Sequence, residues 1–129
     1  MTATRLVPAA CLVAWACGCG GKAAPTMAGG KPVSHWVEEL RSPDPKHRKE
    51  AVEKLGNVGP ADPVAFPAVC GALKDTDPRV RCEAILAVLK FDTAAKESVP
   101  LLDDLRKNDR DARVREYAAR AVERLQSGD

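Results

Sequence analysis

Side chains that carry out acid–base or nucleophilic chemistry are few in this chain, and none is paired with a partner. His35 and His47 are its only histidines, and neither has a Cys, a Ser or a second His at helical spacing. Such catalysis needs a reactive group that a partner side chain orients. The adjacent acidic residues at 38–39 and 103–104 point to different sectors of a helix, so neither pair works as paired carboxylates. We therefore expect a non-enzymatic protein with no metal, no cofactor and no small-molecule substrate.

The five cysteines divide into two groups. Cys70 and Cys82 lie in the charged, later part of the chain, where they either form a disulfide or pack as small apolar thiols. No C-x-x-C pair with a matching Cys or His pair is present, which argues against structural zinc. Cys11, Cys17 and Cys19 all lie within the first 20 residues.

The start of the chain has the features of an export signal. Arg5 precedes an apolar run over residues 6–16, which is too short to span a bilayer and fits the apolar part of a signal peptide. Small residues and the sequence Cys17-Gly18-Cys19 follow. This arrangement resembles a bacterial lipoprotein signal, in which cleavage occurs before a cysteine that carries lipid.

That resemblance implies a signal peptide over residues 1–17 and a lipid on Cys17 or Cys19. It implies an exported protein, periplasmic or at the cell surface, that is held on a bacterial membrane by the lipid alone. The chain departs from the pattern at Ala14, where Leu is preferred. Secretion without lipid and an uncleaved apolar tail remain alternatives.

Residues 18–32 differ in composition from everything that follows. They contain five Gly, two Pro and three Ala, with no acidic residue. Such a composition is typical of a flexible linker. We expect a tether that holds a folded domain, residues 33–129, roughly 20 Å from the membrane.

Composition limits the fold and the partners of that domain. The chain has 129 residues, enough for one small domain, and only 4% of them are aromatic. A core of Ala, Val and Leu favours packed helices over a β-sandwich. The net charge of +2 does not by itself predict nucleic-acid binding.

A repeat of 33–34 residues organises the domain. Its three copies begin at Asp44, Asp77 and Asp111, and each has Arg at +4, Ala at +7 and an aliphatic residue at +11. Aspartate is a good helix N-cap, and Pro directly after it suits the first helical position. Each copy therefore predicts a helix that begins at its Asp.

A shorter apolar helix precedes each of these three. We expect the short helices near residues 34–41, 62–74 and 93–107, with Asp62 capping the second. Pro67 and Pro100 begin or kink their helices. The outward side of the middle long helix is apolar, at Cys82, Ile85, Leu86 and Leu89, so we expect this side to be covered. The equivalent side of the last is mostly polar, as a terminal repeat requires.

The pattern Asp-Pro-x-Val-Arg-x-x-Ala resembles a HEAT repeat, and the three copies cover residues 34–126. The resemblance implies an all-α solenoid of three helical hairpins, with the second helix of each hairpin on the concave, partner-binding surface. The departures are His47 in place of Val, Ala112 in place of Pro, and one extra residue before the third copy.

The arginine at +4 of each copy and the histidine at position 47 each have a structural interpretation. Arg48, Arg81 and Arg115 either form an anion-binding ladder or, as we expect, pair locally with the cap aspartate four residues earlier. His47 takes a place on the core-facing side of its helix, so we expect it to be a half-buried packing residue.

The exposed stripe along the second helices is the candidate binding surface. Arginine and tyrosine often dominate binding energy at interfaces, and Arg suits carboxylate partners. We expect another protein, acidic or peptide-like, to bind there. The alternatives are an anion- or nucleic-acid-binding solenoid, against which the export signal argues, and a lyase-type enzyme or enzyme accessory. The candidate residues are Arg79, Glu83, Lys90, Arg113, Tyr117, Arg120 and Arg124.

Overall fold

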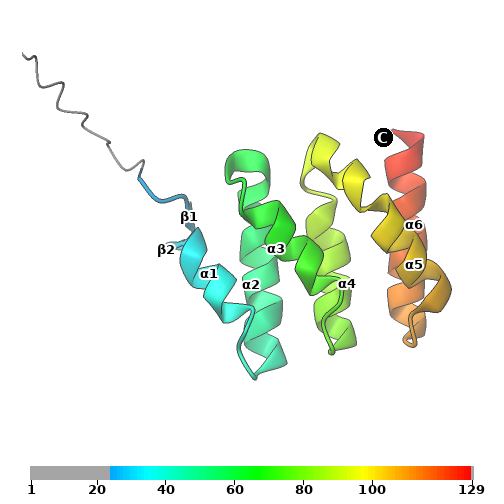
Figure 1. Ribbon diagram of the computed structural model, residues 1–129, viewed down its shortest axis with the longest axis horizontal. Coiled ribbons are helices and arrows are strands. Elements are labelled where there is room, and N and C mark those ends of the chain that lie inside the picture. The colour runs from blue at the N-terminus through cyan, green and yellow to red at the C-terminus, as the bar shows by residue number, and fades with distance from the viewer. Residues whose placement is uncertain (1–23, 129) are drawn as a thin grey trace, which may run out of the picture.

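The computed structural model describes residues 24–128 and arranges them as three consecutive helical hairpins. In Figure 1 the first helices of the pairs, α1, α3 and α5, lie in front, and the second helices, α2, α4 and α6, stand in a row behind them. The helices are α1 (Val33–Glu39), α2 (Pro45–Val58), α3 (Ala65–Ala72), α4 (Pro78–Val88), α5 (Val99–Asn108) and α6 (Ala112–Ser127). The prediction of an all-α stack of three hairpins is confirmed.

The three long helices begin where their aspartates predict. The carboxylates of Asp44, Asp77 and Asp111 each accept a hydrogen bond of 2.8 Å from the backbone N–H two residues later. These bonds satisfy amides that have no partner within the helix. Pro45 and Pro78 occupy the first helical position, where a missing N–H costs nothing.

The first helices of the second and third hairpins begin later than expected. Asp62 accepts from the Val64 N–H at 2.9 Å, which closes a turn, and α3 itself begins at Ala65. In the third hairpin a 3₁₀ helix, Asp92–Ser98, comes first and α5 begins at Val99. Pro67 and Pro100 both lie in the first turn of their helices, because a proline there loses no intrahelical hydrogen bond.

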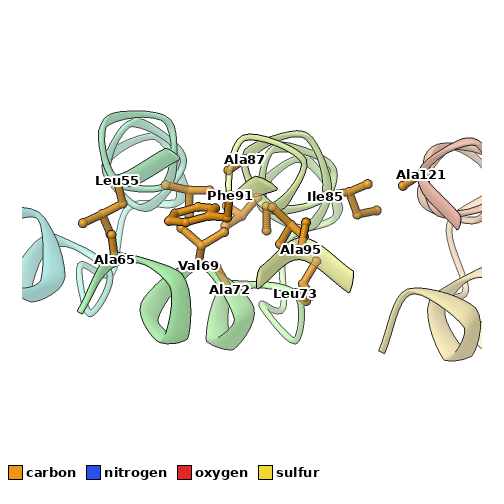
Figure 2. Close-up of a cluster of buried hydrophobic side chains, with 14 of the residues drawn as sticks. Leu55, Ala65, Val69, Ala72, Leu73, Ile85, Ala87, Phe91, Ala95 and Ala121 are labelled. Carbon is orange, nitrogen blue, oxygen red and sulfur yellow. The ribbon is translucent and has the colours of Figure 1, made fainter. Parts of the chain in front are cut away.

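The core lies between the two layers and between neighbouring hairpins. Figure 2 shows Phe91 beside Leu55 of α2 and above Val69 of α3, so side chains from the first two hairpins meet there. All three side chains are at most 1% exposed. The second helices α2 and α4 pack closely at Gly56, where a Cβ atom would lie 2.7 Å from the Cβ of Ala87. Small residues therefore set the spacing of the stack.

The end of the expected tether is folded, which corrects the boundary at residue 32. Strands β1 (Met27–Ala28) and β2 (Lys31–Pro32) form a small antiparallel hairpin. Its turn uses Gly29 and Gly30, both at positive φ, which glycine adopts without strain. The indole N–H of Trp36 donates to the Ala28 carbonyl at 2.8 Å. Since buried Trp36 needs an acceptor, the hairpin is fixed against α1.

The expected signal peptide and the lipidation site at Cys17 or Cys19 lie outside the described residues. Among the described helices, none combines the length and apolar character needed to cross a membrane.

The outward sides of the second helices differ as predicted, with one exception. On α4, Ile85 is fully buried and both Cys82 and Leu89 are half-buried. Leu86 is the exception, because its side chain stays 43% exposed. The polar residues Glu116, Arg120 and Glu123 on α6 are all exposed.

Candidate functional site

The repeated arginines do not pair with their own cap aspartates, so that expectation is wrong. Arg48 instead binds Asp75, with Nε and Nη2 at 2.8 and 3.0 Å from the two carboxylate oxygens. Arg81 binds Asp109 in the same way, with both distances at 2.8 Å. Each arginine therefore reaches the turn of the next repeat, and each pair joins two hairpins.

The geometry of these pairs explains why they are structural. The Arg81 and Asp109 side chains are only 13% and 5% exposed, and a two-point Arg–carboxylate contact is stronger and more directional than a single bond. Asp75 and Asp109 also accept the backbone N–H two residues later at 2.9 Å, which fixes each carboxylate in its turn. We refer to this series of contacts as the arginine–aspartate ladder.

Four of the seven candidate binding residues lie together. Arg79, Glu83, Arg113 and Tyr117 line a hollow of about 300 Å³ on the face formed by the second helices. The hollow, called here the Tyr117 groove, is completed by Lys49, Cys82 and Leu86.

The groove combines an apolar surface with positive charges. Tyr117 and Leu86 are 37% and 43% exposed, and few large apolar side chains among the described residues are so accessible. The guanidinium groups of Arg79 and Arg113 are held by bonds to the cap aspartates of their own helices, at 2.9 and 3.2 Å. Both arginines remain well exposed. This arrangement suits an apolar side chain flanked by carboxylates.

Two pKa shifts follow from these contacts. Hydrogen bonds from Arg79 lower the pKa of Asp77 to about 2. Burial raises the pKa of the Cys82 thiol, so the thiol in the groove is a poor nucleophile at neutral pH. Glu83 lies 3.8 Å from the Lys49 ammonium, which offsets part of the one negative charge in the groove.

The other three candidates do not line this groove. Lys90 donates to the side-chain oxygen of Asn57 at 2.7 Å, and Arg120 pairs with Glu116 on its own helix. Arg124 borders a separate hollow of about 390 Å³ near the end of α6. An α-helix rises about 1.5 Å per residue, so a stripe along one helix face is longer than a single hollow. Candidate residues farther along the stripe therefore lie outside the groove.

Sequence reasoning missed Lys49 and Cys82 as groove residues. They are 33 residues apart and occupy equivalent places in the first two repeats. The repeat spacing was therefore the sequence feature that could have identified both residues as members of one surface. Cys82 was instead assigned to the covered side of its helix, and its half-buried position serves both surfaces.

The remaining chemical candidates have ordinary surroundings. Cys70 and Cys82 are free thiols in the structure. His47 is 59% exposed, near Ser42 and Glu39, so the expected half-buried position is wrong. The equivalent Val80 and Val114 in the next two repeats are fully buried. Within residues 24–128, no group of three His, Cys, Asp or Glu side chains is placed to hold a metal ion.

A larger hollow, of about 480 Å³, lies beside the ladder. Its wall includes Asp75, Arg81 and Asp109, whose charged groups already bind ladder partners. The Tyr117 groove is the better candidate because two of its lining side chains, Leu86 and Tyr117, are large, apolar and exposed.

The comparisons with known proteins agree with this architecture. No curated protein matches the chain closely enough to be counted as a relative. The family model for HEAT repeats matches residues 33–123, which include both ladder pairs, the first two hairpins and the third as far as residue 123 in α6. HEAT repeats generally mediate protein–protein interaction. With most of its length matched, the chain belongs to the HEAT-repeat family.

Proposed function

We propose that this protein is a non-enzymatic binding module, and that the Tyr117 groove receives a short acidic segment of another protein. The observation that carries the proposal is the exposure of Tyr117 and Leu86 beside Arg79 and Arg113. Large apolar side chains exposed next to arginines are typical of interface centres.

The charge around the groove favours an acidic ligand. Lys49, Arg79 and Arg113 line the groove together with Glu83. Asp77 and Asp111 bind the two arginines from their own helices, but both guanidinium groups stay well exposed and can contact a ligand. Nε and Nη2 of Arg79 and Arg113 already bind their cap aspartates. These bonds orient the guanidinium groups, and Nη1 of each arginine is the donor that would bind a ligand carboxylate. Because these side chains are held in place, binding costs less side-chain entropy.

We further propose that the protein is exported and acts at a bacterial membrane, anchored through lipid on Cys17 or Cys19. Because residues 27–32 form a folded hairpin, the tether expected over residues 18–32 is shortened to residues 18–26. A Gly-rich segment of nine residues reaches roughly 15–18 Å. The first helical hairpin then lies next to the membrane surface.

Site-specific photo-cross-linking in cells tests the binding proposal. A photoreactive amino acid replaces Tyr117 or Leu86 in separate variants, and Val64 in the control. Val64 is 52% exposed, but it directly precedes α3 and does not line the groove. We expect one protein to cross-link at both groove positions and not at position 64. Equal labelling from all three positions, or none from the groove, contradicts the proposal.

Lipid attachment has its own test. Metabolic labelling with an alkyne fatty acid is compared between the wild type, Cys17→Ser and Cys19→Ser. Loss of label in one variant identifies the lipidated residue. Label that persists in both variants and in the double variant excludes a lipid anchor at these positions.

A further inference from the structure

The arginine–aspartate ladder ends at Arg115 with one side of the guanidinium open. The Nη1 group of each ladder arginine donates to two consecutive carbonyls of the preceding turn, at 2.7–3.3 Å: Arg48 to Ser42 and Pro43, Arg81 to Asp75 and Thr76, and Arg115 to Asp109 and Arg110. Arg115 is thus held like the other two, and its orientation is fixed before any partner binds.

The difference lies in the other two nitrogens. Nε and Nη2 of Arg48 and Arg81 bind Asp75 and Asp109. Among residues 24–128, no carboxylate binds Nε or Nη2 of Arg115, and the side chain is half-buried at the end of the stack. A pre-oriented guanidinium fork with two free donors is a carboxylate-binding group.

The part of the chain that the structure describes places no further carboxylate at this fork. Residues 1–23 contain no Asp or Glu. Helix α6 continues from Arg115 to Ser127, so its far end lies about 18 Å from Arg115 at 1.5 Å per residue. Asp109, the nearest ladder aspartate, already gives both oxygens to Arg81.

A second copy stacked end to end also lacks the required group. Position 42 is equivalent to the ladder aspartates 75 and 109, because its side chain likewise accepts the backbone N–H two residues later, at 3.3 Å. That residue is Ser42, which has no carboxylate. The first repeat of a second copy would therefore offer Arg115 no carboxylate at this position.

The geometry points to a second docking site, in which Arg115 binds an Asp-x-Asp turn of a different polypeptide. The chain contains two templates for this contact, Asp75-Thr76-Asp77 and Asp109-Arg110-Asp111. In each, the first aspartate binds the arginine and accepts the N–H of the second. The exposed Arg110 beside the site adds positive charge, whereas exposed Glu116 and Glu123 farther along α6 restrict an acidic partner to the turn end. This contact does not depend on the Tyr117 groove.

An NMR titration of the protein tests the inference directly. The N–Hε resonances of Arg48, Arg81 and Arg115 are followed as a capped peptide with the sequence of residues 73–79 is added. Its matched control carries Asn at position 75, and acetate serves as the free carboxylate. We expect the Arg115 resonance to saturate at a peptide concentration at least tenfold below that needed for acetate or the Asn peptide. The resonances of Arg48 and Arg81 stay in place.

Three results overturn the inference. An Arg115 resonance that does not move, or that responds equally to both peptides, removes the carboxylate requirement. Retention of full peptide affinity by Arg115→Lys, followed through backbone amides of residues 109–115, shows general charge attraction instead of fork recognition. A shift that depends on protein concentration without peptide assigns the site to a second copy. The Tyr117→Ala variant should bind the peptide like the wild type, which separates this site from the groove.

Discussion

Arg81 and Asp109 form a two-point ion pair across the boundary between the second and third hairpins, with two N–H···O distances of 2.8 Å. The pair is nearly buried, with side chains 13% and 5% exposed. Its arginine also binds the turn of its own repeat through the carbonyl of Asp75. One side chain therefore connects the starts of two successive repeats.

Replacing Arg81 by Gln should lower the free energy of unfolding by about 3 kcal/mol, because Asp109 is then left partly buried without its partner. Arg115→Gln is the matched control. It loses two carbonyl bonds and no carboxylate contact within the described residues, so about 1 kcal/mol is expected. Urea unfolding measures both values. Equal losses for the two variants contradict a stabilising role for the inter-repeat pair.

Gly56→Ala should separate α2 from α4, because the new Cβ would lie 2.7 Å from the Cβ of Ala87. Overpacking of this kind costs about 1–3 kcal/mol. Gly71→Ala is the control, since its Cβ meets nothing within 4 Å. That variant should be neutral or more stable by up to about 1 kcal/mol. Thermal unfolding of both variants checks the spacing, and a Gly56→Ala variant as stable as Gly71→Ala refutes it.

The lowered pKa of Asp77 predicts that the folding stability of the protein decreases at acidic pH. This pKa is lowered from 3.8 to about 2 by Arg79, so the folded protein keeps this charge at pH values where the unfolded chain binds a proton. The stabilisation is present above pH 4 and is lost as the pH falls from about 4 to 2. Asp77→Asn keeps a good N-cap without the titrating group.

The difference in stability between the wild type and Asp77→Asn should therefore be constant above pH 5 and shrink below pH 4. Denaturant unfolding at a series of pH values measures it. The remaining carboxylates titrate in both proteins and cancel in the difference. If the difference stays the same down to pH 2, the Arg79–Asp77 contact does not shift this titration.

Trp36 reports whether the N-terminal hairpin is fixed. The chain has two tryptophans, so a Trp15→Phe background isolates the signal of Trp36. Deletion of residues 24–30 removes the Ala28 carbonyl that accepts from the indole and exposes a ring that is now 4% accessible. Its fluorescence emission should move to longer wavelength. An unchanged spectrum means that the segment behaves as a free tether.

The helices were predictable because their signals are local. Asp44, Asp77 and Asp111 cap the helices that they precede, and capping depends only on residues within one turn. The starts of α3 and α5 were less predictable. A proline suits any place in the first turn of a helix, so Pro67 and Pro100 do not determine the first residue.

The ladder was not predicted because its partners belong to different repeats. The local pairing of Arg48 with Asp44 satisfies the usual i,i+4 spacing, and only the packing of one hairpin on the next brings Asp75 closer. A signal was nevertheless present, since Asp-x-Asp occurs at 75–77 and at 109–111 but not in the first repeat. The folded hairpin at Gly29 was hidden by a composition typical of linkers.

The candidate binding stripe covers more of the second helices than the Tyr117 groove does. Helical periodicity identifies which residues share one side of α6, and two of these, Arg113 and Tyr117, line the groove. It does not say where along the helix a hollow forms. That depends on neighbouring side chains such as Leu86 and Lys49, which come from other repeats.

The affinity of the cross-linked partner for groove variants tests the central claim most directly. The partner identified by photo-cross-linking at position 117 is titrated against the wild type, Tyr117→Ala and the control Val64→Ala, by isothermal titration calorimetry. Loss of a central tyrosine at an interface costs about 2 kcal/mol, or roughly 30-fold in Kd. We expect that loss for Tyr117→Ala and a change below about twofold for Val64→Ala. Equal affinity of the wild type and Tyr117→Ala would contradict binding in the Tyr117 groove.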